Sequence, residues 1–128
     1  MAHIYYVLFI LTLFPFVLTW MTAYVRFKQL GKIDNRNPRG QYAELKGLGA
    51  RLVAAQNNCW EALIIFVAVT FIAYANNVDM HQFDTIAWVY LGLRVLFVIC
   101  YAKGLGLIRS LVFVASMLCC FYIATFAF

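Results

Sequence analysis

Four long apolar runs occupy nearly the whole chain, and no other feature limits the possible folds so strongly. The runs cover residues 4–25, 49–76, 85–102 and 107–128. A helix that spans a bilayer needs about 20 predominantly apolar residues, so each run is long enough to cross. Charged residues make up only 12% of the chain, whereas soluble domains carry about 25%. We therefore predict an all-α membrane protein with a single four-helix transmembrane domain over residues 1–128.

The lysines and arginines predict how this bundle is oriented. Six of them lie in the connection over residues 26–48 and two lie at Lys103 and Arg109, while the connection between the second and third runs has none. Cytoplasmic loops of membrane proteins carry an excess of Lys and Arg. We expect loops 26–48 and 103–109 to be cytoplasmic and both termini to face the other side of an inner, or cytoplasmic, membrane. This distribution argues against nucleic acid as a partner.

Residues outside the spans predict turns rather than further domains. In the first connection, Asn37 precedes Pro38 and Gly40 follows soon after, a pattern typical of a turn.

The four cysteines lie within apolar runs, where thiols behave as small buried hydrophobes. Neither they nor His3 and His81 have the spacing of a metal site, so we predict no bound metal.

Polar residues interrupt the second apolar run, RLVAAQNNCWEALIIF (residues 51–66). On a helix, Arg51, Asn58 and Glu61 fall within a sector of about 80°. Glu61 lies roughly 15 Å deeper than Arg51, and Arg94 of the third run reaches nearly the same depth from the other direction. A charge at mid-membrane costs about 2.5–3.5 kcal/mol, so both side chains should face protein or water. We expect Glu61 and Arg94 to meet, either in a structural ion pair or in a polar pocket open to the cytoplasm.

Four motifs give the sequence a family resemblance. They are RLVAAQNNCWEAL (51–63), VRFK (25–28), LRVLFVICY (93–101) with IRS (108–110), and NPR (37–39). Taken in their order along the chain, they resemble the MAPEG superfamily, the membrane-associated proteins of eicosanoid and glutathione metabolism. The NPR motif is similar to the bacterial branch of that family.

The resemblance implies a four-helix protomer, a homotrimer, and glutathione bound as cosubstrate between protomers on the cytoplasmic half. It assigns the catalytic role to Arg109, because a cation near a thiol lowers the thiol pKa and raises the thiolate fraction. The residues that it implies as glutathione contacts are Arg26, Arg51, Gln56, Asn58, Glu61, Arg94, Tyr101 and Ser110.

Two functions follow from the resemblance. The first is a glutathione-dependent transferase or peroxidase that acts on a hydrophobic electrophile reached through the membrane lipids. The second is a non-catalytic protein of the same fold that binds or presents a lipid. Ala54, Ala62 and Phe97 stand where enzymes of the family have polar ligands, which favours the second. A solute transporter is a weaker alternative, because the chain has no inverted repeat.

Overall fold

The computed structural model describes all residues from 1 to 128, and they form helices without any strand. Four helices are long and apolar enough to cross a membrane, so the prediction of an all-α four-span membrane protein is confirmed. The elements are α1 (His3–Leu30), α2 (Pro38–Glu44), α3 (Leu48–Ala75), the 3₁₀ turn η1 (Met80–Phe83), α4 (Asp84–Ala102) and α5 (Gly106–Thr125).

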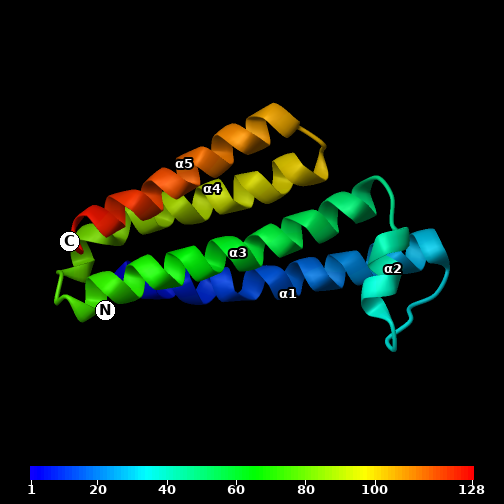
Figure 1. Cartoon of the computed structure of the whole chain (residues 1–128), viewed down its shortest axis with the longest axis horizontal. Coiled ribbons are helices and arrows are strands. Elements are labelled where there is room, and N and C mark those ends of the chain that lie inside the picture. Colours follow the sequence, from blue (N-terminus) through cyan, green and yellow to red (C-terminus); the bar gives the residue numbers. More distant parts are fainter.

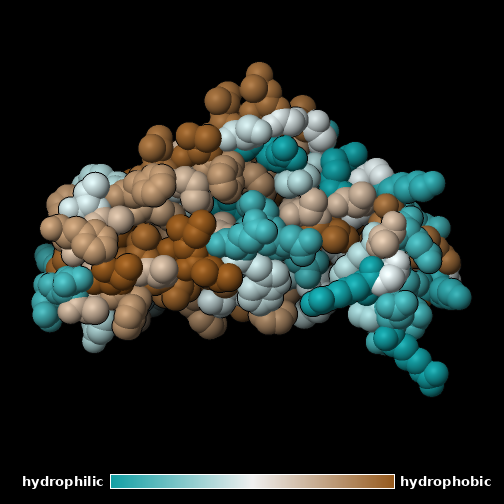
Figure 2. Space-filling view, in the orientation of Figure 1, coloured by the Kyte–Doolittle hydropathy of each residue, from teal (hydrophilic) through white to brown (hydrophobic).

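The long helices lie side by side in an elongated bundle, in which α1 packs mainly on α3 and α4 mainly on α5 (Figure 1). Both termini and the α3–α4 connection lie at one end, which we call the terminal end. Helix α2 and the connection between α4 and α5 lie toward the other, which we call the basic end. Hydrophilic residues gather at the basic end, while much of the remaining surface is hydrophobic (Figure 2). A second hydrophilic patch lies over the middle of α3.

The first connection contains more helix than the sequence indicates. Helix α1 continues past residue 25 to Leu30, where Gly31 takes a left-handed conformation (φ 73°) and its N–H bonds to the Phe27 carbonyl. The Asn37–Pro38 pair, predicted as a turn, instead begins α2. The side chain of Asn37 accepts a hydrogen bond from the Gly40 N–H, and proline at the first helical position removes an N–H that would have no partner there.

The apolar core is divided along the bundle. The larger cluster lies toward the terminal end, where Phe66 of α3 stacks on Tyr90 of α4 with ring centroids 4.4 Å apart. A smaller cluster toward the basic end is built around Leu18 and Leu52. Large apolar side chains such as Phe71 and Phe121 remain exposed on the outside, as expected of a surface that faces acyl chains.

Candidate functional site

A groove of about 500 Å³ opens between α3, α4 and α5. Helix α3 lines it with residues one turn apart, because positions three and four residues apart share a helix face. Five of the predicted glutathione-site residues meet here: Asn58, Glu61, Tyr101, Arg109 and Ser110. The other lining residues are Ala54, Asn57, Phe97, Phe113 and Val114. The groove therefore combines one carboxylate, one guanidinium, amides and hydroxyls with an apolar wall.

Arg109 and Tyr101 form the end of this groove nearest the basic end. The Arg109 guanidinium carbon lies 4.4 Å from the centroid of the Tyr101 ring. Tyr101 also packs edge-on against Phe97, with ring centroids 5.5 Å apart. No carboxylate lies within 4.0 Å of the Arg109 guanidinium, because the only ion pairs of the chain join His3 and His81 to Asp84. The positive charge of Arg109 is thus available to an anion in the groove.

Arg51 lies beside the groove rather than in it. Its Nε donates a hydrogen bond to the Ala102 carbonyl at 3.1 Å, which ties the start of α3 to the last turn of α4. Together with Tyr101 and Arg109, Arg51 lines a smaller cavity of about 150 Å³ at the basic end. Two arginines, Arg51 and Arg109, therefore line this cavity together with Tyr101.

The predicted ion pair between Glu61 and Arg94 is wrong for the single chain. Arg94 is only 1% exposed, and its Nη2 donates to the Asn58 Oδ1 at 2.7 Å. Glu61, one helical turn after Asn58, lies at the exposed surface of the groove. The expected depth in the membrane and the shared helix face did not distinguish Asn58 from Glu61. Arg94 packs against Asn58, which lies nearer the basic end.

Gln56 faces a different groove. Its Nε2 donates to the Thr19 Oγ1 of α1 at 2.8 Å, and its Oε1 is buried without a hydrogen-bond partner. It lines a second groove of about 500 Å³, whose other lining residues are Arg39, Tyr42, Val53, Asn57 and Trp60. Asn57 is common to both grooves, which therefore lie on adjoining sides of α3.

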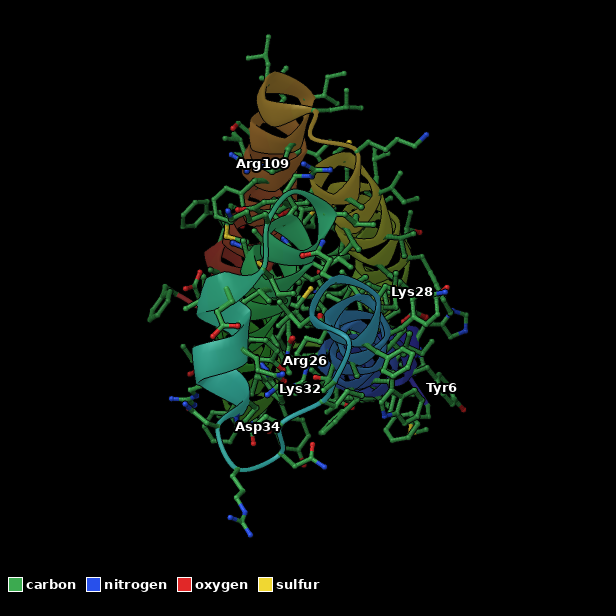
Figure 3. The ribbon with its side chains drawn as sticks, turned by 90° about the vertical axis from the view of Figure 1, so that its right-hand side faces the viewer. Tyr6, Arg26, Lys28, Lys32, Asp34 and Arg109 are labelled. Atoms are coloured by element: carbon green, nitrogen blue, oxygen red, sulfur yellow. The ribbon has the colours of Figure 1, made fainter.

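Arg26, near the end of α1, is held against α2. It is 5% exposed, its Nη1 donates to the Gln41 Oε1 at 3.2 Å, and its guanidinium lies over the Tyr42 ring at 5.1 Å. An end-on view shows Arg26 on the side of α1 that faces α2, well separated from Arg109 on α5 (Figure 3). Within one chain, Arg26 does not reach the groove that contains Arg109.

Sequence reasoning missed several residues of the two grooves. Phe113 follows Arg109 by four residues, so helical periodicity would have placed both on one face. Arg39 and Tyr42 carried no comparable pattern, because the short helix α2 was not expected. Asn57 was missed because it lies outside the sector of α3 that contains Arg51, Asn58 and Glu61. No three His, Cys, Asp or Glu side chains converge in a geometry that would hold a metal ion.

Comparison with known proteins agrees with the four-span architecture. The model of the MAPEG family matches residues 4–128. No curated protein and no solved structure matches the chain. Since the family match covers nearly the whole sequence, the chain belongs to the MAPEG family.

Proposed function

We propose that the protein is an integral membrane glutathione-dependent transferase or peroxidase that acts on a hydrophobic electrophile. The observation that carries this proposal is the groove between α3, α4 and α5, where Asn58, Glu61, Tyr101 and Arg109 converge. Membership of the MAPEG family supports glutathione as the thiol.

The groove offers complementary groups for a zwitterionic tripeptide. The Glu61 carboxylate suits the ammonium group of glutathione, and the Asn58 amide and the Ser110 hydroxyl suit its carboxylates and carbonyls. Arg109 is the cation that would lie beside the sulfur. A positive charge there lowers the pKa of the bound thiol and increases the fraction present as nucleophilic thiolate.

The same groove has an apolar side suited to the electrophile. Phe97 and Phe113 line it, and Val114 is 54% exposed on the outer surface of α5. A hydrophobic substrate dissolved in the bilayer could approach along this side, while glutathione enters from the aqueous basic end. At the boundary between the two, the thiolate would form a C–S bond with an electrophilic carbon as a leaving group departs. With a peroxide, it would instead break the O–O bond to give an alcohol and the sulfenic acid of glutathione, which a second glutathione converts to the disulfide and water.

We further propose that the protein is a homotrimer. In it, the groove that Gln56 lines in one protomer faces the groove between α3, α4 and α5 of the neighbouring protomer. Gln56, Arg39 and Tyr42 of one copy would then complete the site that contains Arg109 of the next. Arg26 would act from the same side through Tyr42, on which its guanidinium packs.

The orientation and the branch within the family are parts of the same proposal. The excess of Lys and Arg in residues 26–48 and 103–109 supports a cytoplasmic basic end, with glutathione on the cytoplasmic half. The Asn37-Pro38-Arg39 motif supports placement in the bacterial branch.

The test uses purified protein in lipid nanodiscs. Calorimetry would measure glutathione binding, and absorbance would follow conjugation of 1-chloro-2,4-dinitrobenzene and reduction of cumene hydroperoxide. We expect binding with turnover of at least one substrate, and loss of turnover by about 10²-fold or more in Arg109→Met. Folded wild-type protein that binds no glutathione would contradict the proposal.

The alternative is a non-catalytic protein that binds or presents a lipid. Ala54 and Phe97, which replace polar ligands of the family's enzymes, both line the groove, and this favours an apolar occupant. Native mass spectrometry of the purified protein would then find a retained lipid, while neither thiol assay would show turnover.

A further inference from the structure

Arg94 is a buried guanidinium without a counter-ion. It is 1% exposed, and no carboxylate lies within 4.0 Å of it, since the chain's only ion pairs involve Asp84. Its contacts are the Asn58 Oδ1, the Cys59 Sγ at 3.9 Å and the face of the Phe97 ring at 4.3 Å. Arginine cannot lose its proton inside a protein, so this charge persists in the middle of the bundle.

Arg94 lies behind the wall of the groove between α3, α4 and α5, and Asn58 lies between Arg94 and that groove. Asn58 lines the groove together with Glu61 and Arg109, whereas Arg94 does not line it and borders a cavity of about 10 Å³ on the inner side of α3. The 2.7 Å bond from the Arg94 Nη2 to the Asn58 Oδ1 joins the two. Of the groove residues that Arg94 contacts, Phe97 offers only an apolar ring, so the Asn58 amide is the polar group through which Arg94 can act on a ligand.

The chemistry of the two groups fixes the direction of that amide. Asparagine carries an acceptor oxygen and a donor NH₂, whereas a guanidinium has only donors. Turning the amide over would place donors against donors beside a positive charge. A hydrogen bond from a charged donor is also roughly twice as strong as a neutral one. Asn58 thus keeps its oxygen toward Arg94 and leaves its NH₂ for the groove.

We propose that Arg94 is a positioning residue that holds the Asn58 NH₂ toward the groove, so that Asn58 can donate to a carboxylate or carbonyl of the bound thiol. This inference rests on the proposed glutathione site and narrows the role of Arg94 within it: Arg94 does not touch glutathione. Without the guanidinium, the amide can turn over and present its oxygen to an acceptor group of the ligand.

Four variants in nanodiscs separate this role from direct binding. Arg94→Met removes the charge and the donors, Arg94→Lys keeps the charge, Asn58→Ala removes the amide, and the double variant combines the first and third. We expect the calorimetric Kd for glutathione to rise about tenfold in Arg94→Met and less in Arg94→Lys. In the Asn58→Ala background, Arg94→Met should change the Kd less than about twofold. A full effect of Arg94→Met in that background would overturn the proposal.

Thermal unfolding separates positioning from support of the fold. Removing a buried charge that has no counter-ion should leave the Tm of Arg94→Met equal to or above that of the wild type. A Tm that falls in parallel with the affinity would show a structural role for Arg94 and overturn the proposal.

A measurement without ligand keeps the inference independent of glutathione. In ¹⁵N-labelled protein, the side-chain amide resonance of Asn58 is identified by its absence in Asn58→Ala. We expect this resonance to shift in Arg94→Met and to stay close to the wild-type position in Arg94→Lys. An unchanged resonance in Arg94→Met would refute the positioning role. Wild-type protein that fails to bind glutathione would refute the proposed function, while the amide resonance would still decide the role of Arg94.

Discussion

The guanidinium of Arg109, from the first turn of α5, covers the ring of Tyr101, from the last turn of α4, at 4.4 Å from its centroid. A tight connection between the two helices brings these residues together, and Gly104 in it has a φ of 74°. The face of the Tyr101 ring restricts the flexible side chain of Arg109, and no carboxylate pairs with its charge. Arg109 is thereby held ready for an anion before any ligand binds.

Replacing Tyr101 should show how much this restriction contributes. Cation–π contacts are worth about 0.5–2 kcal/mol, depending on how far they are removed from water. We expect Tyr101→Leu to lower kcat for glutathione conjugation up to about tenfold, because Arg109 becomes mobile. Tyr101→Phe keeps the ring and serves as the matched control. Equal losses in the two variants would assign the effect to the hydroxyl instead of the ring.

The buried glutamine of α2 should stabilise the first connection. Gln41 accepts hydrogen bonds from the Arg26 Nη1 and the Asp34 N–H, and donates one to the Lys32 carbonyl. Gln41→Ala leaves a buried guanidinium short of an acceptor, which should cost about 1–3 kcal/mol. We expect a lower Tm and faster hydrogen exchange of amides in residues 26–45. Gln82→Ala, at an exposed glutamine near the terminal end, should change neither quantity.

Much of the fold, and only part of the site, could be predicted from the sequence. The spans follow from the length of the apolar runs, because bilayer thickness sets a minimum length for each helix. Periodicity places Asn58 and Glu61 on one side of α3. It does not determine which of them meets Arg94, since both are within reach of a long side chain from the neighbouring helix. Gln56 and Arg26 face other surfaces of the chain, and the periodicity of one helix does not reveal which elements pack against each of its faces.

Asp84 should cap a helix other than its own. Helix α1 has no side-chain cap at its N-terminus, and the Asp84 Oδ1, from the start of α4, accepts a hydrogen bond from the His3 N–H at 2.6 Å. A carboxylate at a helix N-terminus satisfies a free N–H and interacts favourably with the helix dipole. We expect Asp84→Ala to destabilise the protein by about 1 kcal/mol and to speed hydrogen exchange in the first turn of α1. Thr85→Ala, at the exposed neighbouring position, is the control, and equal effects would contradict a specific cap.

Two helical glycines should respond in opposite ways to an added methyl group. A Cβ on Gly49, near the start of α3, would lie 3.1 Å from the Val25 Cγ1 of α1 and 3.1 Å from the Leu45 Cβ. A Cβ on Gly92, in α4, would meet nothing within 4 Å. Overpacking of a close helix contact costs about 1–3 kcal/mol, whereas alanine is favoured over glycine inside a helix by up to about 1 kcal/mol. We therefore expect Gly49→Ala to lower the Tm in nanodiscs and Gly92→Ala to leave it unchanged or raise it.

If Gly49→Ala were as stable as the wild type, α1 and α3 would not approach as closely at this point as the structure shows. Because α3 carries Asn58 and Glu61, a shift of α3 away from α1 in Gly49→Ala should also weaken glutathione binding, and Gly92→Ala should not.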